Sequence, residues 1–230
     1  SISNYGLNLL DRTSIPRQCG ALVGIYGQDE VDEFWNTNIA PEVARMKEHL
    51  EHPNMNHALG FSIVRMSLTA KPTFFSRTTD PRLTKSPLTT FMSTIRQLAV
   101  HLTGCNIAQN QLCLSATHGG YGIMDLPTVA PAAYLASILT AKRVIRSLLN
   151  NSNEEIKNAV GNSGTFKQIE YSLKELSVPP LANLTPTSFF NASYQSVGMQ
   201  RDLSLHLSIA AQKKYEAIVR TQTPSQKALH

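Results

Sequence analysis

The sequence is poor in the features that mark several large classes of protein. Its 230 residues include only three cysteines, too few for a dense disulfide framework, and 12 each of glycine and proline, too few for a fibrous or low-complexity chain. The longest weakly polar run, Ala130 to Leu139, is about half the roughly 20 residues that a membrane-spanning helix needs. We therefore expect no transmembrane helix, and a reduced, intracellular setting that leaves nucleus and cytoplasm undistinguished.

Patterns of several enzyme classes are also missing. The chain has no Asp-Asp pair of the kind that holds two Mg²⁺ ions in a polymerase, and no Gly-x-Ser-x-Gly elbow near Ser115 and His118. Two histidines and two cysteines between residues 101 and 118 match no compact zinc finger in spacing, so buried thiols beside incidental imidazoles are the better interpretation. The glycines at 119, 120 and 122 lack the Lys-Ser/Thr of a phosphate-binding loop and indicate a turn. We expect no catalytic residue, metal site or cofactor in this chain.

Charge is present, but it is unevenly distributed. The net charge is +5, and residues 54–153 hold nine basic and two acidic side chains, whereas residues 1–53 hold four basic and eight acidic ones. A basic segment of this kind indicates a polyanionic partner, although a solvated basic face explains the same count. Phe74 and Phe75 lie between Lys71 and Arg77, a placement that serves either to stack bases or to bury two rings. The candidate nucleic-acid-binding residues are Arg65, Lys71, Arg77, Arg82, Lys85 and Arg96.

The periodicity of the N-terminal half predicts one strand and then helices. Residues 20–27 form a short apolar run bounded by glycine and predict a strand. Residues 28–51 predict a helix with an acidic first turn, divided at Pro41. An apolar stripe then predicts a helix that Lys71-Pro72 stops, with Leu59, Ile63, Met66 and Ala70 as its core side. A further helix is expected from Pro87 to His101, ended by Gly104.

The C-terminal half also predicts helices. A long helix is expected to have Pro131 in its first turn, and a shorter one to bury Ile169, Leu173 and Leu176. Residues 179–200, rich in Pro, Ser, Thr and Asn, predict a polar linker or a draped loop, and a last helix is expected over residues 202–221. The fold class is therefore mainly α, a helical bundle with a short strand near the N-terminus.

Three stretches, in this order, resemble the region that follows the polymerase palm in reverse transcriptases of non-LTR (LINE-like) retrotransposons. Residues 20–27 resemble the LG-x-P-x-G strand of that family, although Val23 and Tyr26 differ from its usual residues. Residues 67–81 resemble its R-x-x-Y-L-x-R-x-x-x-P thumb segment, with Lys71 in place of the first arginine. Residues 114–123 and 132–137 resemble its LP-x-x-x-GGLG turn and A-Y-L-A-S helix, the most specific of the matches. The stretches Gln212-Lys213-Lys214 and Gln226-Lys227-Ala228 are similar to its downstream helices.

The resemblance implies a division of the chain and a function. Residues 1–27 would end a palm-like region, residues 28–150 would form a helical, polymerase-thumb-like domain, and residues 151–230 would be a C-terminal helical extension. The chain, which starts at Ser1 and lacks a stop-like tail, would be a piece of an RNA-directed DNA polymerase whose catalytic aspartates and Mg²⁺ belong upstream.

In that family a thumb contacts the template–primer, so the implied partners are RNA/DNA and the upstream palm region of the same polypeptide. The six candidate cations would bind phosphates, and Gly119, Gly120 and Gly122 would shape a structural turn. The competing class is a non-enzymatic helical scaffold for protein interaction, which would dock through the acidic residues of 29–51 or the polar segment 179–200.

Overall fold

A computed structural model of the chain describes residues 17–18, 21–22, 27–149, 155, 158, 164–176 and 183–191. It is mainly helical, as the sequence predicts. Two-residue strands β1 (Arg17–Gln18) and β2 (Ala21–Leu22) pair antiparallel. Of the strand predicted over residues 20–27, residues 20 and 23–26 lie outside the described residues, as does the last helix expected over 202–221.

The first helical arm is α1 (Gln28–Phe34), a π-helical segment η2 (Trp35–Ile39) and α2 (Ala40–Leu50). The division predicted at Pro41 is confirmed, because η2 separates α1 from α2 and α2 begins at Ala40, although the backbone stays helical through the proline. Pro41 lies in the first turn of α2, where its missing N–H costs no hydrogen bond within that helix. The acidic first turn of α1 is as expected, and the Glu30 carboxylate accepts a hydrogen bond from the Gly27 N–H at 2.8 Å.

The second arm runs through α3 (His57–Ile63), the π-helical η3 (Val64–Leu68) and α4 (Lys71–Thr78). The helix predicted to stop at Lys71-Pro72 does end just before it, at Leu68 of η3, but α4, a helix that the sequence did not predict, begins at Lys71 with the proline in its first turn. The predicted core stripe is wrong: Leu59 is 57% and Met66 78% exposed, whereas Gly60, Val64 and Leu68 are buried.

Helix α5 (Pro81–Thr103) follows and is longer than predicted. It begins at Pro81 rather than Pro87, because Asp80 caps it by accepting a hydrogen bond from the Arg82 N–H at 3.0 Å. The predicted stop is confirmed, since Gly104 adopts φ 68°, a left-handed conformation that glycine allows without strain.

After α5 come α6 (Gln109–Cys113), a 3₁₀ turn η4 (Ala116–His118) and the long α7 (Leu126–Leu149), in which Pro131 lies inside the helix rather than in its first turn. Helix α9 (Thr165–Leu176) buries Ile169, Leu173 and Leu176 as predicted. Helix α10 (Pro186–Asn191) lies within the predicted polar linker, and its Phe189 is fully buried, so that part of 179–200 packs against the bundle.

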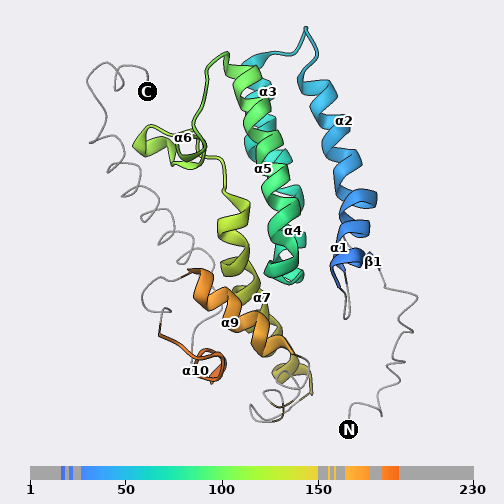
Figure 1. The fold of residues 1–230 in the computed structure, drawn as a ribbon, viewed down its shortest axis with the longest axis vertical. Coiled ribbons are helices and arrows are strands. Elements are labelled where there is room, and N and C mark those ends of the chain that lie inside the picture. Colours follow the sequence, from blue (N-terminus) through green and yellow to red (C-terminus); the bar gives the residue numbers. More distant parts are fainter. Residues whose placement is uncertain are drawn as a thin grey trace.

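Figure 1 shows the long helices lying along one another, with α3 behind α5 and α9 crossing the lower part of α7. The main core joins α1 to α7 and contains a group of aromatic rings. Phe75 of α4 stacks on Phe34 with ring centroids 5.8 Å apart, and Trp35 lies between Phe75 and Phe91. A second cluster joins α7, α9 and α10. Among the described residues, no helix is long and apolar enough to cross a membrane.

Candidate nucleic-acid interface

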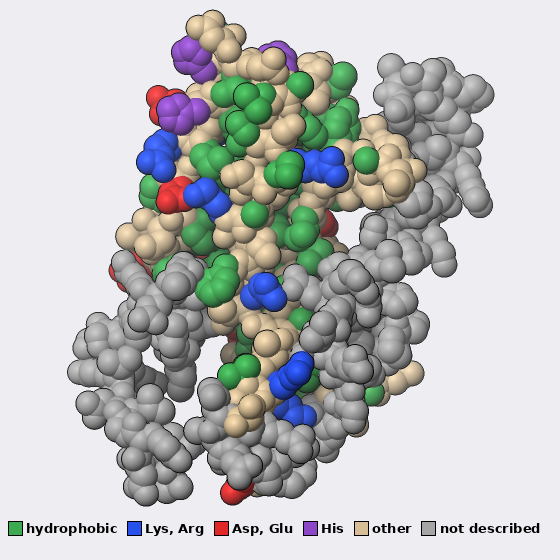
Figure 2. All heavy atoms as spheres, turned by 180° about the vertical axis from the view of Figure 1, so that it is seen from behind, with side chains coloured by type: hydrophobic (Ala, Val, Ile, Leu, Met, Phe, Trp, Pro, Cys, Tyr) green, Lys and Arg blue, Asp and Glu red, His purple; other side chains and the backbone are tan. Residues whose placement is uncertain are grey.

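The six candidate cations are exposed and come from neighbouring elements. Arg65 lies on η3, Lys71 and Arg77 on α4, and the other three on α5. The space-filling view in Figure 2 shows Lys and Arg side chains spread over this face of the molecule among hydrophobic ones, with acidic side chains beside some of them. The cations therefore form a dispersed basic surface rather than one tight cluster.

The helices from α3 to α7 are nearly free of carboxylates. Between residues 52 and 153 the sequence has only Asp80 and Asp125. Asp80 is 2% exposed, and Asp125 accepts a hydrogen bond from the Thr128 hydroxyl at 2.6 Å. Little negative charge is therefore left on these helices to repel a polyanion.

Two of the cations are paired with carboxylates from other elements. Lys71 contacts Glu42 of α2, and this hydrogen bond and charge lower the pKa of the Glu42 carboxyl. Lys85 lies 3.2 Å from Glu175 of α9, which raises the pKa of the lysine. A phosphate that binds either lysine has to compete with these carboxylates.

Arg96 makes a backbone contact. Its Nε donates to the carbonyl of Ile107 at 2.8 Å, which holds the connection after α5 against that helix. This contact accounts for one N–H of the guanidinium and gives Arg96 a structural role.

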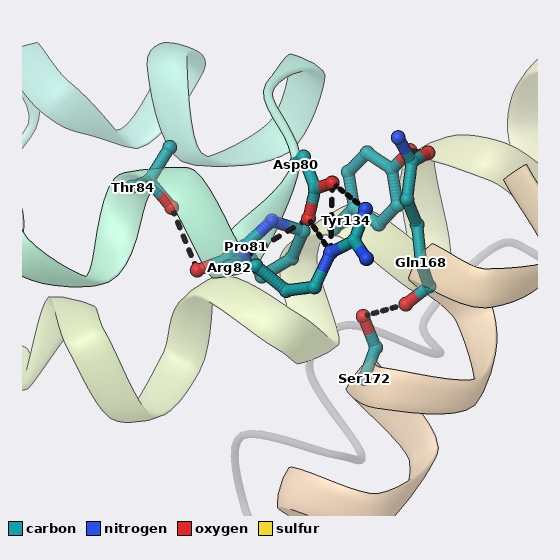
Figure 3. Close-up of polar contacts among 7 residues, drawn as sticks. All are labelled: Asp80, Pro81, Arg82, Thr84, Tyr134, Gln168 and Ser172. Carbon is teal, nitrogen blue, oxygen red and sulfur yellow. Dashed lines mark hydrogen bonds and ion pairs between the residues drawn. The ribbon is translucent and has the colours of Figure 1, made fainter. Parts of the chain in front are cut away.

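Arg82 is held by Asp80 at the start of α5, as Figure 3 shows. Its Nη2 lies 2.6 Å and its Nε 3.0 Å from Asp80 Oδ2, and this bidentate contact raises the pKa of the guanidinium. In the same view Tyr134 of α7 donates its hydroxyl to the Gln168 side chain, and the Ser172 hydroxyl donates to the Gln168 carbonyl at 2.8 Å. Arg82 therefore lies where α5, α7 and α9 meet, and its main contact is structural.

Arg65 and Arg77 differ from the other four. In the part of the chain that the structure describes, neither side chain has a hydrogen bond or ion pair. The guanidinium of Arg65 lies beside the backbone at Gly122, where a Cβ would come within 3.2 Å of Nη2. These two arginines are the members of the predicted set with most hydrogen-bonding capacity left for a ligand.

The predicted turn at Gly119, Gly120 and Gly122 is a compact loop of backbone hydrogen bonds. Gly119 and Gly122 adopt φ 80° and 67°, and a Cβ at Gly120 would lie 2.1 Å from the carbonyl oxygen of Leu114. The three glycine N–H groups donate to carbonyls at residues 116, 115 and 114, respectively. Because these donors are already used, the loop offers no cradle of free N–H groups for a phosphate. It also packs onto α3, with the Tyr121 and Phe61 rings 5.5 Å apart.

The thiols and imidazoles do not assemble into a site. Within the described ranges, no three His, Cys, Asp or Glu side chains are placed to hold a metal ion together. Burial, with a smaller effect of Asp125, raises the pKa of the Cys113 thiol to about 12, so it is protonated at neutral pH.

Sequence reasoning missed the exposed apolar side chains beside the cations. Of the Phe74-Phe75 pair, Phe75 is fully buried and Phe74 is 46% exposed. Met66, which the periodicity assigned to the core, is the most exposed of the large apolar residues. The sequence alone did not indicate which apolar residues are exposed, because the exposed residues and the buried residues of this arm both recur every three or four positions.

Comparison with known proteins provides no family or relative for this chain: no protein-family model matches it, and neither a curated protein nor a solved structure is significantly similar.

Proposed function

We propose that this chain binds the sugar-phosphate backbone of nucleic acid through the basic surface of α3, η3, α4 and α5, as the thumb-like part of a reverse-transcriptase-like protein. The observation that carries the proposal is the near absence of carboxylates from residues 52–153 together with exposed cations along these helices. A phosphate backbone has about one charge per 1.7 Å of duplex axis, so a dispersed row of cations complements it better than a single cluster does. Catalysis is not part of the proposal.

The protein contacts that each cation makes indicate how much it should contribute to nucleic-acid binding. Arg65 and Arg77 are available without breaking a hydrogen bond or ion pair in the described residues, and Lys71 and Lys85 are available once their carboxylate partners are displaced. Arg82 and Arg96 contribute chiefly to the fold. We therefore expect Arg65 and Arg77 to carry most of the salt-dependent binding.

The test is fluorescence polarisation with a labelled RNA/DNA hybrid duplex over a range of salt concentrations. The Arg65→Ala/Arg77→Ala variant should bind more weakly, and the slope of log affinity against log salt should flatten by about two units, about one for each arginine that no longer binds a phosphate. The matched control is Arg45→Ala, an exposed arginine on the acidic α2, which should leave the slope unchanged. An unaltered slope in the double variant would refute the assignment.

A protein-interaction scaffold is the second candidate, and the observation in its favour is the acidic first arm. Residues 28–51 hold seven carboxylates, most of them exposed. Binding to a basic protein through this arm would lack the steep counterion-release slope of nucleic acid. A folded chain that binds no hybrid duplex at low salt would favour this candidate.

A further inference from the structure

The second helical arm has one continuous exposed stripe opposite its buried one. The buried residues Gly60, Val64, Leu68, Pro72, Phe75 and Thr79 recur every three or four positions through α3, η3 and α4. The exposed residues do the same on the opposite side. We call this exposed stripe the α3–α4 ridge; it consists of Leu59, Ser62, Met66, Ala70, Phe74 and Arg77.

Large apolar side chains lie along the α3–α4 ridge in contact with water. Met66 is 78%, Leu59 57% and Phe74 46% exposed, and they account for three of the five large hydrophobic side chains that are exposed in the described residues. Single exposed apolar residues are common, but a line of them along one helical arm marks a contact surface.

The charges on the helical arm that forms the ridge are all positive, and the carboxylate of Glu42, from α2, pairs with Lys71 beside Ala70. Arg65 precedes Met66, and Arg77 follows Phe74 by three positions on the same side of α4. Residues 52–79 contain no Asp or Glu. Figure 2 shows hydrophobic and basic side chains interspersed on one face of the molecule, together with some acidic ones. The occupant of this surface must therefore be anionic and must also have flat apolar faces.

Unpaired nucleic acid meets both requirements. In a duplex the base faces are covered by stacking, whereas a single strand exposes them to aromatic and apolar side chains while its phosphates remain available to arginine. At about 1.5 Å per residue, Met66 and Phe74 are about 12 Å apart along the arm, and Arg65 and Arg77 about 18 Å apart. This length suits a strand of several nucleotides laid along the ridge.

We propose that the α3–α4 ridge binds single-stranded nucleic acid, with Phe74 and Met66 contacting base faces and Arg65 and Arg77 binding the adjoining phosphates. This inference rests on the proposed function and adds the strand class to it. Stacking is not an ionic interaction, so it adds affinity without adding to the salt slope.

The experiment compares labelled oligothymidine, an oligouridine of equal length and a duplex of equal length, by fluorescence polarisation over several salt concentrations. The variants are Met66→Ala/Phe74→Ala and Phe74→Leu, and the leucine keeps a large apolar side chain but removes the ring. The matched control is Met124→Ala, because Met124 is 43% exposed but lies outside the ridge. Circular dichroism establishes that each variant is folded, and sedimentation velocity gives its oligomeric state.

We expect the double alanine variant to lose about tenfold or more in affinity for both single strands, with an unchanged salt slope, and to bind duplex as before. Phe74→Leu should lose part of that affinity, and Met124→Ala none. Unchanged single-strand binding, or an equal loss for duplex, overturns the inference; the proposed function survives if Arg65→Ala/Arg77→Ala still flattens the slope.

Two further outcomes also contradict the inference. If the wild-type chain is a dimer and the double variant a monomer, the ridge is a protein contact. If the folded wild-type chain binds none of the three probes at low salt, the proposed function fails and the ridge assignment fails with it.

Discussion

Replacing the buried Asp80 should destabilise the fold more than replacing any of the exposed charges described above. In Asp80→Ala the start of α5 loses its cap, which costs about 1 kcal/mol. The same change removes the bidentate contact with Arg82, and because the Arg82 side chain is 44% exposed and water can replace its partner, we assign about 1–2 kcal/mol to this effect. The sum is a decrease of about 2–3 kcal/mol in the free energy of unfolding, or about 4–12 °C in Tm for a chain of this size.

Asp80→Asn separates the two contributions, since asparagine also caps helices but has no charge. We expect it to lose about half as much stability as Asp80→Ala. Urea unfolding followed by far-UV circular dichroism measures both variants, and the midpoints should shift at constant m value. The reasoning is refuted if Asp80→Ala stays within about 0.5 kcal/mol of the wild-type chain, or if the two variants are equally unstable.

The same contact predicts how Arg82 differs from Arg77. Arg82→Ala leaves a carboxylate that is 2% exposed without its cation and should lower Tm, with little effect on the salt slope of nucleic-acid binding. Arg77→Ala should flatten the salt slope and leave Tm nearly unchanged. Thermal unfolding and the polarisation titration on both variants check this prediction. A salt slope that flattens in Arg82→Ala but not in Arg77→Ala would show that Arg82, and not Arg77, binds the phosphate.

Three further predictions concern other parts of the molecule. Glu175→Gln frees Lys85 from its ion pair and should raise affinity for nucleic acid about two- to fivefold at low salt, measured by polarisation; a loss of affinity would contradict the competition between carboxylate and phosphate. Iodoacetamide at about pH 8 should label the exposed Cys105 far faster than Cys113, whose pKa is raised to about 12, and mass spectrometry of the labelled peptides would show equal rates if the burial is wrong. Gly120→Ala places a methyl group 2.1 Å from a backbone carbonyl, so it should lower Tm by several degrees, and an unchanged Tm would contradict this close approach of the loop to Leu114.

The sequence predicted most of the helices correctly, but it predicted the wrong buried side for α3 and η3. Both sides of α3 and η3 have residues at helical spacing, and the bulkier side, with Leu59 and Met66, was expected to be the core. The buried side instead contains Gly60, where a Cβ would come within 2.8 Å of Leu102 Cδ2, so the absence of a side chain lets α3 approach α5 closely. The π-helical turn η3 also has more residues per turn than an α-helix, so a 3.6-residue pattern that is extended through it places the wrong residues on the core side.

The helix starts show a second limit of local patterns. A proline was interpreted as a stop at residue 72 and as a start at residue 87, whereas residues 72 and 81 lie in first turns and residue 87 lies inside α5. The capping aspartate at residue 80 indicates the start at Pro81, because an Asp-Pro step places an acceptor and a preset φ together at a helix start, whereas no side-chain cap marks the start of α4 at Lys71-Pro72.

The candidate interface was predictable as a basic segment but not as a set of free and paired cations. Lys85 and Glu175 are 90 residues apart in sequence, and no local pattern indicates that α9 brings the carboxylate to the lysine. Likewise, the sequence did not indicate which of the neighbouring residues Phe74 and Phe75 is buried. The packing of α4 against Phe34 and Trp35 buries the ring of Phe75 and leaves that of Phe74 in water.

The contact between Glu42 and Lys71 makes the attachment of the first helical arm sensitive to acid. Because Lys71 lowers the pKa of Glu42, the stability from that pair is present above the pKa of the unfolded chain and is lost as the pH falls through the lower, folded value. Acid therefore weakens the attachment of α2 to α4, whereas α3, α5 and α7 contain no Asp or Glu.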